Sequence, residues 1–190
     1  MVQRRGLLTG MVAIGTATLA GCSGSSDDSS ASGDGGESEE DEETETTHQI
    51  GDTFTVGEGD RAIEYTVNGA TTYEAIGGEF SQEEPDGIFL VVQLELTNQA
   101  DESFSISSSA FSVRDSEGRT FDPDTGAGVY LSTDDRIEGE AISFDQLNPG
   151  LSKSGVLVFD VPPGESVGLL IEPSGIFDSS ESHFVELGGI

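Results

Sequence analysis

The feature that most constrains the fold is an alternation of apolar residues along residues 87–98. Large aliphatic side chains occupy every second position: Ile88, Leu90, Val92, Leu94 and Leu96. Successive side chains of a β-strand point to opposite faces of a sheet, so these five share one face. The opposite face begins apolar and turns polar toward residue 97. We therefore predict a central strand with one deeply buried face.

Shorter runs with the same period of two recur along the chain, at residues 53–56, 62–67, 104–106, 111–114, 142–147, 155–161, 167–171 and 184–187. Turn signals rich in Gly and Pro separate them, and no stretch keeps a helical period for three turns. This pattern predicts an all-β fold, an immunoglobulin-like antiparallel β-sandwich. Asn68-Gly69 leaves two alternatives open: a type I′ hairpin turn, or a bulge in one long strand that runs to Tyr73.

The charge of the chain excludes several functions. Its 190 residues include 37 Asp and Glu but only 7 Lys and Arg, a formal charge of −30. Nucleic acid would repel such a chain, so we expect no nucleic-acid partner. A single Cys allows neither an internal disulfide nor a thiolate zinc site.

Residues 1–21 have the pattern of a signal peptide of the twin-arginine type. Arg4 and Arg5 precede an uncharged segment, residues 6–20, which is shorter than the roughly 20 residues that a membrane-spanning helix needs. The alternative is an uncleaved transmembrane helix. The segment ends in Leu19, Ala20, Gly21 and Cys22, which resembles a lipobox, the motif at which lipoprotein precursors are cleaved and the Cys is lipidated.

Lipidation at Cys22, the only cysteine, would attach the protein to the membrane. Stable anchoring needs two acyl or alkyl chains, and lipobox lipidation normally supplies a glyceryl group that carries two. We therefore expect a lipid-anchored protein on the extracellular face of the cell membrane.

An acidic segment follows the lipobox. Residues 23–47 contain 10 carboxylates and no apolar residue larger than Ala. Such a segment cannot bury enough surface to fold, and its like charges repel, so residues 22–49 are predicted to form a disordered, extended linker. The 25 residues 23–47 alone would span about 80 Å at full stretch. An acidic interaction tail is the alternative.

The remaining residues, 50–190, have the length of one domain. Removing the 10 acidic residues of the linker leaves 27, which face only 5 basic residues, and Lys153 is the only Lys. Molar salt shortens the Debye length to about 3 Å and so quenches the repulsion among carboxylates. We interpret this composition as adaptation to high salt and expect the domain to lose structure at low ionic strength.

Several motifs resemble the DUF4352 family. Residues 87–98 (GIFLVVQLELTN) resemble its long strand ending in Asn, and residues 111–118 (FSVRDSEG) its F-x-L-x-D-x-x-G hairpin. The sequences LNPG at 147–150 and GVLVFDVP at 155–162 resemble its last conserved segment, and residues 50–67 its first two strands.

The resemblance implies an immunoglobulin-like sandwich related to telokin-like extracellular domains, common on secreted proteins and lipoproteins, and it implies no catalytic residues. With the export signal, the lipobox and the acidic composition, the chain also resembles haloarchaeal surface lipoproteins. A shared fold does not by itself assign a function.

The sequence offers little for catalysis. A Ser-His-Asp arrangement would need His48 or His183 as its base, and no G-x-S-x-G elbow presents a nucleophile. We interpret His183 as a surface residue beside a strand. We therefore expect no catalytic residues.

Asp122, Asp124, Asp134 and Asp135 are candidate ligands for a cation. Ca²⁺ binds 6–8 oxygens, which acidic loops can supply. The segment lacks the EF-hand pattern, however, and acids are common everywhere in this chain, so the alternative is a solvated acidic loop. No cofactor other than this Ca²⁺ is expected.

Two loops are candidates for contact with a partner, residues 73–87 and 120–136. They carry Tyr73, Phe80 and Tyr130, and aromatic side chains often anchor protein interfaces. The alternative is that these rings only cover the ends of the sandwich. The leading hypothesis is a binding or accessory module at the outer membrane surface that engages a surface protein or envelope component. A solute- or Ca²⁺-binding lipoprotein is the other hypothesis.

Overall fold

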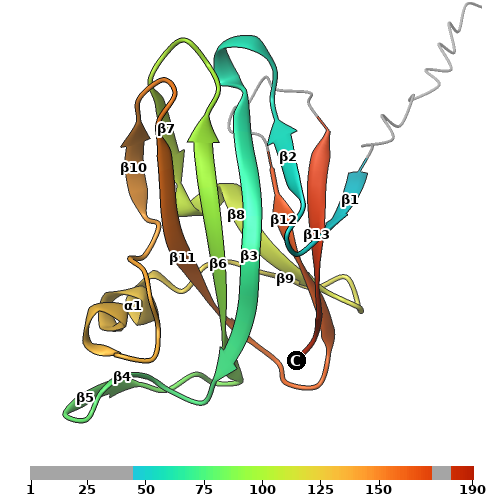
Figure 1. Cartoon of the computed structure of the whole chain (residues 1–190). Coiled ribbons are helices and arrows are strands. Elements are labelled where there is room, and N and C mark those ends of the chain that lie inside the picture. Colours follow the sequence, from blue (N-terminus) through green and yellow to red (C-terminus); the bar gives the residue numbers. More distant parts are fainter. Residues whose placement is uncertain (1–44, 173–180) are drawn as a thin grey trace, which may run out of the picture. The chain divides into compact units, whose positions relative to one another are not determined.

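A computed structural model describes residues 45–172 and 181–190 as two packed β-sheets (Figure 1). The five-stranded sheet has the order β1 (Glu45–Gln49), β13 (Ser182–Gly189), β12 (Ser166–Ile171), β8 (Phe111–Asp115) and β9 (Thr120–Phe121). The four-stranded sheet has the order β11 (Ser152–Val161), β6 (Ile88–Asn98), β3 (Ile63–Tyr73) and β2 (Thr53–Val56). Within these sheets β1 pairs with β13 in parallel and the other neighbours pair antiparallel. The predicted all-β sandwich is confirmed.

Smaller elements extend the two sheets. β10 (Phe144–Leu147) pairs with β7 (Phe104–Ser107), and β4 (Ile76–Gly78) pairs with β5 (Ser81–Glu83) as a short hairpin. The helical elements are η1 (Gly59–Arg61), η2 (Ser108–Ala110), α1 (Thr125–Gly128) and η3 (Val129–Thr133). In the part of the chain that the structure describes, no helix has the length and apolar character needed to cross a membrane.

The main core lies between the two sheets, and the predicted central strand β6 contributes to it as expected. Leu90, Val92, Leu94 and Leu96 are all at most 1% exposed and pack against buried residues of β8, β12 and β13. The alternation in this strand therefore predicted its buried face correctly.

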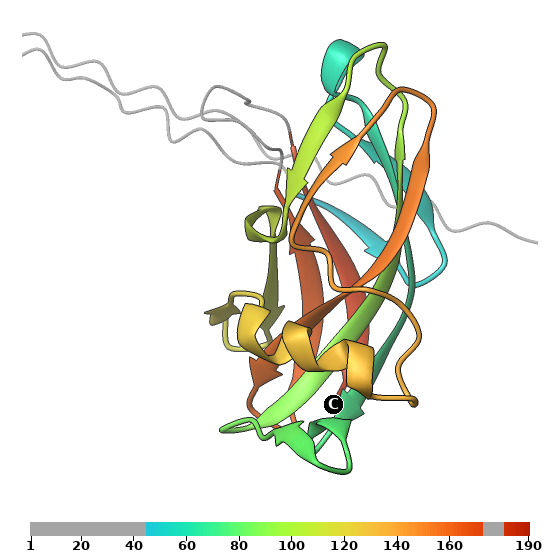
Figure 2. The ribbon, with the colours of Figure 1, turned by 90° about the vertical axis from the view of Figure 1, so that its left-hand side faces the viewer.

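The outer face of the four-stranded sheet is also partly covered. Phe89 and Val91 of β6 and Val156 and Val158 of β11 form a second buried cluster. Its cover comes from outside the sheet, chiefly from Ile76, Ala127, Leu131 and Ile137. Figure 2 shows the helical turns of α1 and η3 lying across this face. The apolar start of the second face of β6 thus marks a covered region of the sheet.

The segment Asn68-Gly69 is a bulge. β3 runs without a turn from Ile63 to Tyr73, and its pairing with β6 shifts register between Val67 and Gly69. Of the two alternatives for this dipeptide, the long bulged strand is the one that the structure contains.

The predicted boundary between linker and domain, at residues 49 and 50, is wrong. β1 begins at Glu45, inside the segment predicted to be disordered, and pairs along its length with β13. Its negative charge is offset locally, because Arg114 Nη2 lies 2.7 Å from the Glu45 carboxylate. Composition alone could not reveal a partner strand more than 130 residues away. The rest of the predicted linker, residues 22–44, and the predicted signal peptide lie outside the described residues.

Candidate binding surface

The two loops proposed from sequence as contact regions pack against each other. The segment 73–87 contains the β4–β5 hairpin, and the segment 120–136 contains α1 and η3. The backbone N–H of Gly77 donates to Asp134 Oδ2 at 3.0 Å, and Arg136 Nη2 donates to the carbonyl of Ala75 at 2.8 Å. We call residues 74–83 together with residues 129–136 the hairpin surface.

Asp134 is the residue that joins the two segments. Its side chain is 2% exposed, and Arg136 binds both carboxylate oxygens, with Nε 2.8 Å from Oδ1 and Nη2 2.6 Å from Oδ2. These hydrogen bonds from Arg136 hold the pKa of the Asp134 carboxyl well below its usual range, against the opposing effect of burial. The same contact raises the pKa of Arg136. A charged, bidentate pair therefore anchors the hairpin to the helical segment.

Arg136 also contacts an aromatic ring at the end of β3, next to the hairpin surface. Its guanidinium carbon lies 5.1 Å from the centre of the Tyr73 ring, a distance typical of a cation–π contact. Tyr73 is half-buried and packs against the second cluster, as does Tyr130. The positions of these two rings therefore agree better with the hypothesis that they cover the sandwich than with the hypothesis that they are exposed anchors for a partner.

The backbone of the hairpin requires glycine at its start. Gly77 has φ of +129°, a conformation that residues with a side chain rarely adopt. A Cβ on Gly77 would also overlap the carbonyl oxygen of Ser81 in the facing strand. The close pairing of β4 with β5 at this position therefore requires a residue without a side chain.

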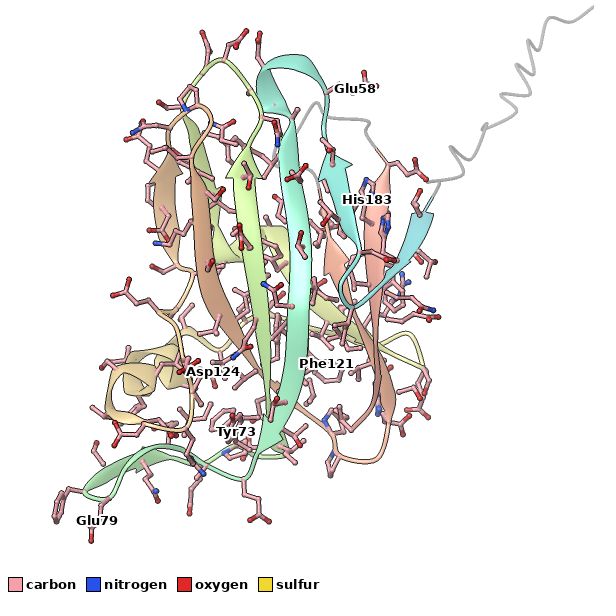
Figure 3. The ribbon with its side chains drawn as sticks, in the orientation of Figure 1. Glu58, Tyr73, Glu79, Phe121, Asp124 and His183 are labelled. Carbon is pink, nitrogen blue, oxygen red and sulfur yellow. The ribbon has the colours of Figure 1, made fainter. Side chains whose placement is uncertain are left out.

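Phe80 lies at the tip of the hairpin and is 96% exposed. Val129, at the start of η3, is 73% exposed. Acidic residues surround these apolar side chains, among them the exposed Glu74, Glu79 and Asp135. Figure 3 places Glu79 at the outer end of the hairpin, away from both sheets. A nearly fully exposed aromatic ring on a braced hairpin is available to a partner.

The four candidate cation ligands do not form a common site. Asp134 binds Arg136, and Asp124 Oδ1 accepts from the backbone N–H of Ala127 at 2.9 Å as the N-cap of α1. Asp122 and Asp135 are exposed. Among the residues that the structure describes, no group of three or more His, Cys, Asp or Glu side chains could hold a metal ion. Of the four candidates, Asp124 thus caps a helix and Asp134 anchors a hairpin.

The residues of the predicted export and lipidation signals lie outside the described residues: Arg4, Arg5, Leu19, Ala20, Gly21 and Cys22.

Sequence reasoning missed the contact between the only two histidines. His48 Nε2 lies 2.9 Å from His183 Nδ1, and both rings are half-buried. His183 is therefore not the isolated surface residue that was predicted. The alternation of Thr46 and His48 with exposed neighbours was a signal for β1, but the acidic composition around it concealed that signal.

Comparisons with known proteins bear on the whole domain. A family model described as "Domain of unknown function (DUF4352)" matches residues 48–181. The chain belongs to the DUF4352 family. The resemblance seen in the strand and turn motifs is thereby confirmed.

Solved structures of similar fold include the yjhA protein from Bacillus subtilis, with 19% identity and a TM-score of 0.53. That match covers 74% of this chain and 98% of the other. A secreted protein from Mycobacterium tuberculosis, MPT63, matches with 14% identity and a TM-score of 0.50, covering 74% of this chain and 95% of the other. No curated protein matches the chain. At these identities the likeness concerns the fold.

Proposed function

We propose that this DUF4352 protein is a lipid-anchored surface protein whose domain binds a protein or another envelope component at the outer face of the cell membrane. The observation that carries the proposal is the 96% exposure of Phe80 on a hairpin that is held in place by Asp134 and Arg136. Aromatic side chains that become buried in a partner contribute much of the binding energy of interfaces, so an exposed ring on a braced hairpin is suited to this role.

A binding role accounts for the arrangement better than a catalytic one. Phe80 lies on an edge of the molecule, beside exposed carboxylates and a covered sheet face. The proposal needs only that the hairpin keep its shape. Asp134 holds the hairpin through the N–H of Gly77, and the absence of a side chain on Gly77 allows the close pairing of β4 with β5. The calcium alternative gains no support from the positions of the four candidate Asp residues.

The location rests on the sequence Leu19-Ala20-Gly21-Cys22 and the twin arginines. A secreted protein is among the proteins of similar fold, which agrees with export. Changing Cys22 to Ser should release the protein into the medium. A variant that stayed in the membrane fraction would argue for an uncleaved helix.

Photo-crosslinking tests the binding role directly. A photoreactive phenylalanine analogue would replace Phe80 in cells grown in molar salt, and the same analogue at Phe144, which is 73% exposed on β10, would serve as the matched control. We expect one dominant crosslinked product from position 80 and none from position 144. Equal products from both positions, or none from either, would contradict a specific partner at the hairpin surface.

A further inference from the structure

The two histidines lie where the edges of the two sheets face each other. β1 and β13 belong to the five-stranded sheet, and β2 belongs to the four-stranded sheet. His183 and the fully buried Val185 are two positions apart along β13, so their side chains share the face of the sheet that points toward the core. In the view of Figure 3, His183 lies on β13, with β1 on one side of that strand and β2 on the other. The pair therefore closes one side of the sandwich.

Three aromatic rings form a stack across this side. The His48 ring lies 3.8 Å from the Phe54 ring with an angle of 6° between their planes, and the His183 ring lies 5.2 Å from Phe54 with an angle of 15°. Phe54 belongs to β2, so the stack joins the two sheets. Tyr65 of β3 continues it, 6.1 Å from Phe54. The stack keeps β1 attached at the edge of the domain.

The hydrogen bond between the imidazoles depends on their charge. One ring nitrogen must carry a proton and the other must be free to accept it, so the bond cannot survive when both rings are protonated. Burial lowers the pKa of His48 and the pKa of His183, and for His183 the neighbouring His48 lowers it further. Both pKa values therefore favour neutral rings in the folded protein.

Other charged groups near the pair partly oppose this effect. Glu181, the residue before β13, raises the pKa of both rings, and Asp52, in the turn between β1 and β2, raises that of His48. Glu45 of β1 is paired with Arg114 of β8. The pKa values are lowered despite the Glu181 and Asp52 carboxylates, which shows that burial is the stronger influence.

We propose that the histidine pair holds β1 to β13 in a pH-dependent way, so that β1 is released from β13 when the surroundings become acidic. A group whose pKa is lower in the folded state stabilises the fold above its unfolded pKa, near 6.5, and that stabilisation is lost as the pH falls through the folded pKa. As the pH falls below about 6.5, the released state is therefore favoured, because its rings take up protons at a higher pH than the folded pair does. Once both rings are protonated, the hydrogen bond between them cannot form.

β1 is suited to local release. It has five residues, lies at the edge of its sheet and follows directly on the acidic segment. Besides the pairing with β13 and the ring contacts of His48, Glu45 binds Arg114 and Thr46 binds Glu181. Release would free five residues of strand, about 16 Å of extended chain, at the start of the domain.

Two measurements on the full chain in molar salt test the proposal. Proton resonances of the imidazole rings should titrate with apparent pKa values below 6.5. Amide protection factors along β1, corrected for intrinsic exchange, should fall at least about tenfold between pH 7.5 and pH 5, while those of β12 stay constant. Apparent pKa values of the rings at or above 6.5 would overturn the proposal. Amide protection factors along β1 that do not change between pH 7.5 and pH 5 would overturn it as well.

Variants separate the histidines from the many carboxylates. The double variant His48→Phe with His183→Phe keeps both rings in the stack and removes both titrating groups, so protection of β1 should no longer change between pH 7.5 and pH 5. The double variant His48→Gln with His183→Gln serves the same purpose if the Phe variant does not fold. A pH-dependent loss of protection that persists in either folded variant would assign the effect to other groups and contradict the proposal.

Discussion

At the residue scale, Asn98 shows how one polar side chain at the end of a strand joins three segments. It is fully buried, donates through Nδ2 to the carbonyls of Glu102 and Leu147, and accepts at Oδ1 from the N–H of Ala100. These bonds satisfy a buried amide completely, which such a group requires. The sequence marked this Asn as part of the family's long strand, but its partners lie in the loop after β6 and at the end of β10, which no pattern of periodicity connects.

Asp134 gives the prediction at this scale. Asp134→Asn removes the charge that Arg136 binds and weakens the contact to Gly77, so we expect a loss of about 2 kcal/mol in the free energy of unfolding at pH 7. Denaturant unfolding in molar salt measures it. The adjacent, exposed Asp135→Asn is the control and should change stability by less than about 0.5 kcal/mol.

The same pair predicts a pH dependence. Because the folded pKa of Asp134 is lowered, its contribution is complete above the unfolded pKa of about 3.9 and is lost as the pH falls below it. The difference between wild type and Asp134→Asn should therefore shrink on acidification below about pH 4. A constant difference down to pH 2 would contradict the assigned ion pair.

At the scale of the elements, the strands of the two main sheets were mostly predictable and the additions to them were not. β6, β8, β11 and β12 have strong apolar alternation and were predicted within a few residues. β1 carries mostly polar residues and forms through pairing with the distant strand β13. The strands of the β4–β5 hairpin have three residues each, too few for an alternation to show. The helix α1 has four residues, too few for a helical period to show.

Close packing between β12 and β13 gives a second prediction. A Cβ on Gly168 would overlap the Phe184 ring, and Arg114 covers that ring 4.6 Å from its centre. Gly168→Ala should displace the ring and lower the free energy of unfolding by about 1–3 kcal/mol. Gly189→Ala, on β13 with open space at its Cβ, is the control and should cost much less. Equal effects of the two substitutions would show that Phe184 does not rest on Gly168.

At the scale of the whole molecule, acidic residues greatly outnumber the basic residues that could neutralise them. Arg114, Arg119, Arg136 and Lys153 each form an ion pair, with nitrogen-to-oxygen distances of 2.6–2.7 Å for the shortest contact of each. With 27 acidic residues against 5 basic ones from residue 48 onward, most carboxylates must rely on dissolved cations. The repulsion among them is the main cost that salt can relieve.

This balance predicts that the domain needs salt. Circular dichroism should show the β-sheet signal in molar salt and its loss in dilute buffer, and the melting temperature should rise with ionic strength whichever monovalent salt is used. An unchanged spectrum in dilute buffer would exclude adaptation to high salt as the reason for the acidic composition.

The central claim is that Phe80 on its braced hairpin anchors a partner at the cell surface. The most direct test compares the amounts of any co-purifying protein recovered with wild type, Phe80→Ser and Phe144→Ser from native membranes in molar salt, by quantitative mass spectrometry. We predict that a single partner, recovered in near-equal amount with wild type and with Phe144→Ser, is lost at least about tenfold with Phe80→Ser. Undiminished recovery with Phe80→Ser would contradict the claim.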